Sequence, residues 1–410
     1  MEVSEVRKMQ RRAKDAAADE PPPDVVRKFG AAVRQHYLQQ THARYSNAAA
    51  TDFPFHERLV HFWANHFAVS ADKHIVSALA GSFENEVVRP NLNSHFYELL
   101  LAAEQHPAMI LYLDNQRSIG PNSQIATRAR RRKRRQDVGL NENLAREILE
   151  LHTLGVDGGY TQDDVTTFAK VITGWSIGGS GPDGRFAEGT PGEFEFRDNI
   201  HEPGSHSVLG KRYREKGIGQ GEAVLRDLSV HPSTAKFVAT KLARHFAGDE
   251  PPAALVERLA AVFLDTDGHL PSVHAALVNA SEPWASIQAK YKTPQDFVVS
   301  AFRAFRHVPK DGKTVAGVLE LLGQAPYRPG SPAGWPDTID HWGGADALYK
   351  RIEWSNTVAR LAGSLINPVQ LGESVLGPAF SDHSRTAIAR AESSEQGLTM
   401  LLASPEFQRR

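Results

Sequence analysis

The feature that most constrains the fold lies in residues 141–175, which read as a helix, a glycine turn and a second helix. Asn141 is placed to cap the first helix, because a short side-chain acceptor satisfies free backbone donors there. Gly155 fits the left-handed conformation that ends many helices. Thr161 and Asp164 resemble the capping box that opens a helix. We therefore expect a helical hairpin in this part of the chain.

The first helix of this hairpin carries a narrow polar stripe between apolar surfaces. Asn143, Glu147 and Glu150 recur at positions i, i+4 and i+7, and Glu142 and Arg146 flank them. Two interpretations remain open. In the first, the carboxylates face water and make weak local pairs. In the second, they line a pocket, because the apolar surface on both sides leaves little room for a solvated face. Buried carboxylates need partners or a chemical role, since desolvation raises their pKa.

If the stripe lines a pocket, a set of candidate site residues follows. Paired carboxylates suit general acid–base hydrolysis or divalent-metal binding, and a histidine can assist either. The candidate catalytic residues are Glu147, Glu150, Glu142, His66 and His152. The candidate substrate-binding residues are Asn65, Asn143, Arg146, Asp114, Trp175 and Trp335. His66 also shares the apolar face of a helix over residues 55–67, where a histidine is more often a hydrogen-bonded core residue than a ligand.

Two loops carry further candidate groups. In the segment HEPGSH, His201 and His206 lie near Glu202 and are candidate metal ligands, although their spacing matches no compact metal motif. A divalent metal is therefore a candidate cofactor. The loop over residues 327–342 is rich in Pro and Gly, and its Trp335 is either a stacking platform for a sugar or ring, or a hydrophobic plug that seats the loop.

A run of basic residues, Arg128–Arg135, precedes the helical hairpin. Such a run can bind phosphates, but it has no interleaved aromatic residues on which bases could stack. We therefore expect a solvated loop, and nucleic acid is not an expected partner.

Composition bounds the class of protein. The chain has 410 residues, of which 41% are apolar, and a formal net charge of −1, so it can bury a sizeable core and has no global attraction to nucleic acid or membranes. The absence of cysteine excludes disulfides, cysteine nucleophiles and thiolate metal sites. No apolar run approaches the ~20 residues of a transmembrane helix. The first residues lack the apolar segment of a secretory signal, which predicts a cytoplasmic protein.

Helical periodicity over most of the chain predicts a mainly α multi-helix globular bundle. A glycine-rich stretch after Trp175, followed by short alternating segments, predicts a small β-hairpin insert around residues 190–215. The predicted units are an N-terminal helical extension (1–50), a helical core with the candidate site (51–175), the loop and hairpin insert (176–216), and a C-terminal helical part that packs on the same core (217–410).

The chain resembles a bacterial family catalogued as domain of unknown function 1800. The central block NENLAREILELHTLGVDGGYTQDDVTTFAKVITGW carries the resemblance, and FWANHF, HPSTAKFVATKL, KTPQDFVVSAFRA, PAGWPD and SPEFQRR support it. The resemblance implies a mostly helical protein without an agreed reaction, and relatives that often begin with an export signal. The family's usual FWHNHF reads FWANHF here, with Ala64 in place of a histidine. The family's polar positions correspond to Glu142, Asn143, Arg146, Glu147, Glu150, His152 and Thr153.

Three functions follow from these observations. The first is a hydrolase of unknown substrate with a Glu-, His- and Asn-lined pocket, acting on a glycan or another small polar molecule. The second is a non-catalytic binding or assembly protein, in which the acidic stripe is a structural network around Arg146. The third is a metal-dependent oxidoreductase, although Glu147 is followed at i+3 by Glu150 rather than by the histidine of di-iron bundles. The sequence leaves the oligomeric state open.

Overall fold

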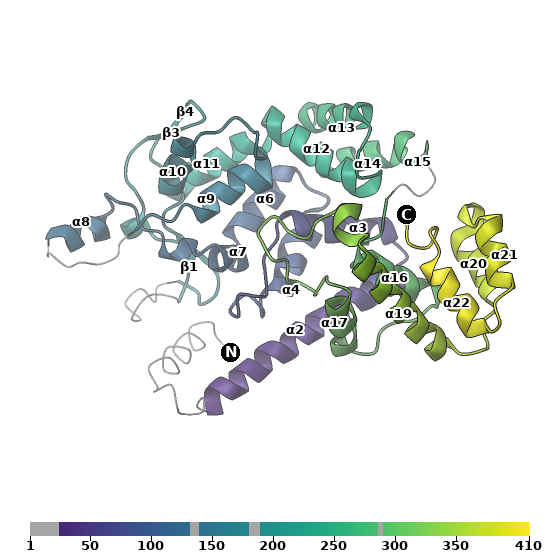
Figure 1. The fold of residues 1–410 in the computed structure, drawn as a ribbon. Helices are drawn as coiled ribbons and strands as arrows, with labels where there is room; N and C mark the ends of the chain where they lie inside the picture. Colours follow the sequence, from purple (N-terminus) through teal and green to yellow (C-terminus); the bar gives the residue numbers. More distant parts are fainter. Residues whose placement is uncertain (1–23, 132–138, 180–188, 286–289) are drawn as a thin grey trace.

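The computed structural model describes residues 24–131, 139–179, 189–285 and 290–410. Helices dominate these residues, and their β structure consists of two small antiparallel sheets of two strands each (Figure 1). The prediction of a mainly α protein with a small β insert is therefore confirmed. Within the described residues, no helix is long and apolar enough to cross a membrane. The predicted N-terminal extension is described only from Asp24 onward.

The first half of the chain contains most of the helices around the main core. They are α2 (Asp24–Ala50), α3 (Pro54–His66), α4 (Ala80–Phe83), the π-helix η1 (Glu84–Val88), α5 (Arg89–Asn91), α6 (Phe96–Gln105), α7 (Pro107–Tyr112), the short 3₁₀ helix η2 (Asn115–Arg117), α8 (Gln124–Arg131), α9 (Asn143–Glu147), the π-helix η3 (Ile148–Thr153) and α10 (Gln162–Val171).

The β insert is divided between two sheets. Strand β1 (Trp175–Ile177) pairs with β2 (Phe194–Phe196), and after η5 (Asp198–Ile200) strand β3 (His206–Val208) pairs with β4 (Lys211–Tyr213). Only β3 and β4 form a tight hairpin, because Leu209 and Gly210 both adopt positive φ angles, 51° and 74°, as a two-residue hairpin turn requires.

The chain is helical again after the insert. The helices are α11 (Ile218–Ser229), α12 (Pro232–Phe246), α13 (Ala253–Asp265), α14 (Leu270–Asn279), α15 (Glu282–Ala285), α16 (Pro294–Ala304), α17 (Gly312–Leu321), α18 (Ile339–Trp342), α19 (Ala345–Ala362), α20 (Pro368–Leu376), η6 (Gly377–Ala379), α21 (Asp382–Ala389) and α22 (Ser394–Ala403).

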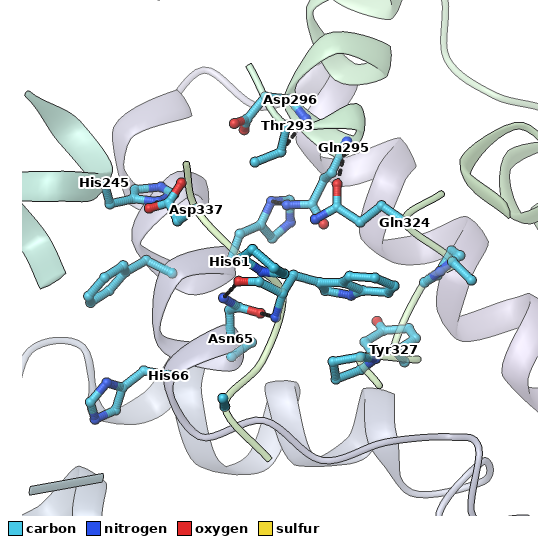
Figure 2. Close-up of a pocket in the computed structure, with 18 of the residues that line it drawn as sticks. His61, Asn65, His66, His245, Thr293, Gln295, Asp296, Gln324, Tyr327 and Asp337 are labelled. Atoms are coloured by element: carbon cyan, nitrogen blue, oxygen red, sulfur yellow. Dashed lines mark hydrogen bonds and ion pairs between the residues drawn. The ribbon is translucent and has the colours of Figure 1, made fainter. Parts of the chain in front are cut away.

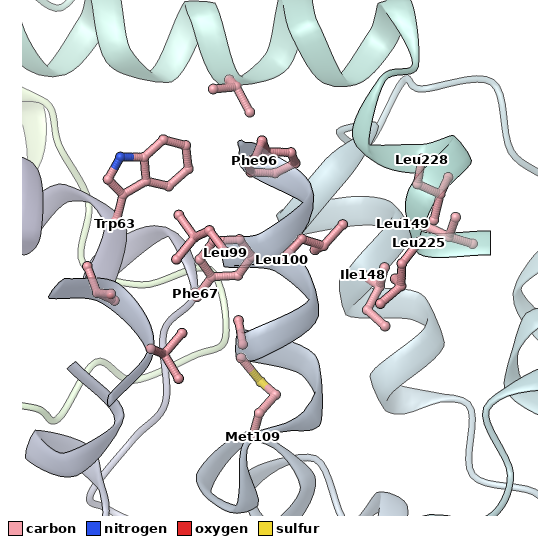
Figure 3. Close-up of a cluster of buried hydrophobic side chains, with 14 of the residues drawn as sticks. Trp63, Phe67, Phe96, Leu99, Leu100, Met109, Ile148, Leu149, Leu225 and Leu228 are labelled. Atoms are coloured by element: carbon pink, nitrogen blue, oxygen red, sulfur yellow. The ribbon is translucent and has the colours of Figure 1, made fainter. Parts of the chain in front are cut away.

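The main hydrophobic core runs from Leu59 to Ala280 in the sequence and is built around α6. Figure 3 shows Trp63 of α3 and the adjoining Phe67 on one side of α6, and side chains of η3 and α11 on the other. Trp63, Phe67 and Phe96 are fully buried, and each contributes about 1.5–3 kcal/mol by leaving water. One core thus combines residues from the three predicted units that cover 51–410.

A second core joins the C-terminal helices to α2. It contains Tyr45 of α2, Phe297 of α16, Trp354 of α19 and Phe407 near the end of the chain. The long α2 runs past α17 toward α16 in Figure 1, and contacts both helices. The space between the two cores is where the candidate site lies.

The local helix signals of the central hairpin are largely confirmed. Thr161 and Asp164 form a complete capping box at the start of α10, and Gly155 has a φ angle of 84° after the first helix. Asn141 lies two residues before α9 rather than at its cap, although its Oδ1 accepts a hydrogen bond from the Asn143 amide at 3.0 Å.

The predicted stripe of the first helix changes direction halfway along it. From Ile148 to Thr153 the backbone is π-helical, so each turn contains more residues than the 3.6 assumed in the periodicity. Leu154 follows Glu150 by four residues, so a regular α-helix would place it in the polar stripe; here it is 3% exposed and belongs to the main core.

The basic run is partly helical rather than a loop. Arg128, Arg130 and Arg131 form the last turn of α8, and their side chains are exposed. Residues 132–138 lie outside the described residues. The expectation of a loop was therefore wrong for the first part of the run, and the expectation of solvation was correct there.

Candidate functional site

A cavity of about 330 Å³ opens between α3, the end of α12, the start of α16 and the loop over residues 324–338. Figure 2 shows His61 and Asn65 of α3, with His245 of α12 beside Asp337 on one side and Gln295 and Gln324 on the other. Apolar side chains such as Phe62, Val69 and Phe83 form part of its wall. A mostly apolar wall with a few converging polar groups is typical of sites for small molecules.

Helix α12 supplies the charged groups because of its position against the main core. His231 caps the helix, Pro232 occupies its first turn, and Val238 and Leu242 are fully buried. This packing leaves Lys241, Arg244 and His245 to line the cavity at positions i, i+3 and i+4.

The most organised pair in the cavity consists of His245 and Asp337. The Nδ1 atom of His245 lies 2.9 Å from Oδ2 of Asp337, while Lys290 lies 3.3 Å from the other carboxylate oxygen. The Arg410 side chain donates to the His245 carbonyl at 3.1 Å and holds that end of the helix in place. Within the described part of the chain, no group is hydrogen-bonded to Nε2 of His245. The carboxylate therefore orients the ring and leaves its second nitrogen for a ligand.

The electrostatics of this pair suit a neutral imidazole. Burial lowers the pKa of His245, and the nearby carboxylate of Asp337 offsets this only in part. Burial opposes ionisation of Asp337, but His245 and Lys290 outweigh it and hold the pKa of Asp337 well below its usual range. At neutral pH the pair is a neutral histidine beside a carboxylate, which is an arrangement that can accept a proton.

Lys241 is an unusual cation in the same cavity. No carboxylate pairs with it among the described residues, and its Nζ atom lies 5.4 Å from the centre of the Phe237 ring. Burial lowers the pKa of Lys241 to about 8, with Asp337 acting in the opposite direction. A half-buried ammonium group without a partner is a natural contact for an anion.

A second histidine, His61, is held by neutral groups on the other side of the cavity. Gln295 donates to its Nδ1 atom at 2.9 Å, and the Tyr45 hydroxyl donates to the Gln295 side-chain oxygen at 3.0 Å. Nε2 of His61 lies 3.6 Å from Glu57. Burial and the nearby Arg44 lower the pKa of His61 well below its usual value, so this ring is neutral as well.

Asn65 fixes the loop that closes the cavity. Its side chain donates to the Trp335 carbonyl at 3.0 Å and accepts from the Trp335 amide at 2.7 Å. Gly334 packs directly on Asn65, where a Cβ atom would lie 2.4 Å from the backbone oxygen. Asn65 is thus a loop anchor, while the half-buried Trp335 lines the cavity and packs on Trp342 with ring centres 6.0 Å apart.

His66 and His152 belong to a buried polar chain beside the cavity. His66 is 1% exposed, and its Nε2 donates to the His152 carbonyl at 3.0 Å. Nδ1 of His152 lies 2.7 Å from a carboxylate oxygen of Glu104, and both side chains are fully buried. His66 therefore has the expected role of a hydrogen-bonded core histidine, although it also contributes to the cavity wall.

The polar stripe on the central helix lies elsewhere, and none of its residues lines this cavity. Glu142 accepts hydrogen bonds from Thr166, Gln162 and Arg146 at 2.7–3.1 Å. Glu150 accepts one from Tyr160 at 3.4 Å. The exposed Asn143 and the half-buried Glu147 complete the stripe, and burial raises the pKa of Glu147.

The remaining predicted residues also lie apart from the cavity. Asp114 pairs with Lys73 at 2.7 Å. Trp175 is fully buried in the main core, so it packs rather than offering a ring face to a substrate. His201 is buried and contacts the Thr173 carbonyl at 2.8 Å. Neither His201 nor His206 belongs to a group of three or more potential metal ligands, and the residues that the structure describes contain no such group.

The sequence patterns did not identify His245 and Asp337, which are 92 residues apart in the chain. Two features of the sequence nevertheless point weakly to them. His245 follows Lys241 by four residues at the end of a strongly periodic helix, and Asp337 ends the rigid PAGWPD loop.

The structure is that of a mainly α-helical protein with a cavity lined by a histidine–aspartate pair and a lysine that has no ion pair among the described residues. The chain belongs to the family described as protein of unknown function (DUF1800), whose model matches residues 2–409. This match confirms the resemblance noted in the central block. A search of curated proteins and a search of solved structures each found no match.

Proposed function

We propose that the protein is a hydrolase that acts on a small, polar, negatively charged substrate in the 330 Å³ cavity. The observation that carries the proposal is the 2.9 Å contact of Asp337 with Nδ1 of His245, a residue that lines the cavity and whose Nε2 has no hydrogen bond within the described residues. A histidine held in this way is the common general base of hydrolytic sites.

In the proposed reaction, Nε2 of His245 accepts a proton from a water molecule as the water oxygen attacks the substrate ester. The bond to the leaving alcohol then breaks, and the imidazolium returns the proton to the oxygen of that alcohol. Asp337 orients the ring and stabilises the positive charge that forms on it. Lys241 and Arg244 bind the anionic group and stabilise negative charge that develops in the transition state. The lining residues include no serine or cysteine, which favours direct attack by water over a covalent intermediate on such a side chain.

The roles differ from those predicted from the sequence. Asn65 and Trp335, which the sequence predicted to bind substrate, line this cavity. We assign the acid–base function to His245 in place of Glu147 and Glu150. Trp335 supplies an aromatic surface in the cavity wall, which suits a sugar ring or another flat polar group.

The test is hydrolysis of a panel of chromogenic phosphate, sulfate and carboxylate esters by the full-length protein. His245→Gln and Asp337→Asn should each lower kcat/KM by roughly 10²–10⁴-fold, the usual contribution of a positioned general base. His383→Gln is the matched control, because His383 is exposed on α21 and should leave activity unchanged. A substrate that is turned over equally by wild type and His245→Gln would refute the assignment, and binding without turnover would favour the non-catalytic alternative.

A further inference from the structure

A second, smaller cavity of about 160 Å³ lies next to the candidate site. It is enclosed by α3, by one face of α16, by the end of α2 and by Arg410. His61 and Asp296 line both cavities, so the two cavities are adjacent.

The smaller cavity has an excess of positive charge. Its lining contains four cationic side chains, Arg58, Lys292, Arg303 and Arg410, and two carboxylates, Glu57 and Asp296.

Both carboxylates already have partners. Glu57 accepts two hydrogen bonds from Arg89, at 2.6 and 2.9 Å, and one from Asn47 at 2.6 Å. Asp296 lies 3.1 Å from Arg410. Within the described residues neither carboxylate forms an ion pair with Arg58 or Lys292, although the charge of Asp296 attracts both.

Arg58 is the cation that this arrangement leaves unpaired. Arg303 donates to carbonyl groups at the end of α2, and Lys292 donates to the Phe407 carbonyl at 2.7 Å. Arg58 has no hydrogen bond or ion pair within the described residues. Its guanidinium lies 4.5 Å from the centre of the Phe246 ring, and its Nε and Nη2 atoms are enclosed without partners.

Arg58 and Lys292 are therefore cations that no carboxylate pairs with among the described residues, and burial disfavours their charged forms. Burial and the neighbouring Arg410 lower the pKa of Arg58 to about 9, and burial lowers the pKa of Lys292 to about 7. Enclosed charges are unfavourable unless they are paired, so a bound anion would supply Arg58 and Lys292 with a favourable partner.

We infer that the smaller cavity binds an oxyanion of the phosphate type, with Arg58, Lys292 and Arg410 as its ligands. The planar guanidinium of an arginine matches the geometry of phosphate oxygens. The volume equals that of about five water molecules at ~30 Å³ each, which is enough for one such group with little else. Resting on the proposed function, we further assign this anion to a phosphorylated end of the substrate, because the two cavities share lining residues.

The test measures binding of inorganic phosphate to the full-length protein by calorimetry and by thermal unfolding, at constant ionic strength set with chloride. Phosphate should raise the wild-type unfolding temperature above that in chloride. Arg58→Met should weaken phosphate binding by about tenfold or more, the loss expected for one charge-assisted contact. In chloride alone, Arg58→Met should be as stable as wild type or more so, because it removes an unpaired charge. Arg360→Met, at an exposed site on α19, is the matched control.

Two outcomes would overturn the anion site. One is no greater stabilisation by phosphate than by chloride, and the other is equal phosphate affinity in wild type and Arg58→Met. If Arg58→Met does not fold, Arg58→Lys keeps the charge but loses the planar fork, and an unchanged phosphate affinity in that variant would equally contradict the inference.

A second arm separates a substrate subsite from a site for free phosphate. The probe is 3-phosphoglycerate, which carries a carboxylate as well as its phosphate. It should bind more tightly than inorganic phosphate, and Lys241→Met should weaken only this ester, whose carboxylate reaches the larger cavity. If Lys241→Met affects neither ligand, the assignment to the substrate is wrong. Binding is measured without turnover, so these results do not depend on whether the proposed hydrolysis occurs.

Discussion

At the scale of single residues, the candidate site depends on how burial changes the charge of a few side chains. His245 and His61 are both enclosed, and burial lowers the pKa of each, so both rings are neutral near pH 7. Lys241 keeps its charge there, with a pKa of about 8. A neutral base and a charged lysine are the two protonation states that the proposed hydrolysis needs.

These shifts predict the pH dependence of kcat/KM. Below pH 6.5 the lowered pKa keeps His245 deprotonated, and activity should fall only as the pH drops through that lowered value. On the alkaline side, activity should fall above about pH 8, because Lys241 loses the proton that makes it attractive to an anion. The measurement is the pH profile of kcat/KM with any ester that the wild type hydrolyses.

Two variants on one helix provide the control for this profile. Lys241→Met should lower kcat/KM and abolish the alkaline limb near pH 8, whereas Lys236→Met, at an exposed position of α12, should preserve the whole profile. An alkaline limb that survives in Lys241→Met would show that another group causes it.

At the scale of elements, the loop over residues 324–338 positions Asp337 and Trp335, and α3 holds the loop through Asn65. The Asn65 side chain makes both of its hydrogen bonds with the backbone of Trp335, donating one and accepting the other. Gly334 brings the loop close enough for these bonds, with a φ angle of 80°. The loop is therefore an ordered part of the site rather than a loose cover.

This contact predicts a large effect of Gly334→Ala. A methyl group would lie 2.4 Å from the Asn65 backbone oxygen in a left-handed conformation that suits glycine, so we expect a loss of about 1–3 kcal/mol in the free energy of unfolding. Gly330→Ala in the same loop is the control, since no atom lies within 4 Å of its added methyl group. Urea unfolding measures both, and equal stability of the two variants would disprove the close packing.

At the scale of the whole molecule, the last residues of the sequence connect the second core to the site. Phe407 is 2% exposed and packs edge-on against Phe297 of α16. Arg410 contacts Asp296 and the His245 carbonyl. The segment around Tyr291, which pairs with Arg409 as an isolated bridge, leads directly into α16. The geometry of the cavity therefore depends on the packing of the C-terminal helices.

Phe407→Ala should lower the free energy of unfolding by about 3–5 kcal/mol, the usual cost of removing a buried aromatic ring. Leu361→Ala on α19 is the control, because Leu361 is 83% exposed and should change stability by no more than about 0.5 kcal/mol. Chemical denaturation of the two variants, followed by circular dichroism, tests this difference. A small effect for Phe407→Ala would mean that the second core is not tightly packed.

The sequence by itself determined the local structure of this protein. Helices, the capping box at Thr161 and the glycine after the first central helix depend on neighbours within a few residues, which periodicity and capping patterns record directly. Only the tertiary structure decided the site. The π-helical segment shifted the side chains after Ile148, and His245 meets Asp337 only because two cores bring α12 and the closing loop together. Contacts between residues about a hundred positions apart depend on packing, which no short stretch of sequence encodes.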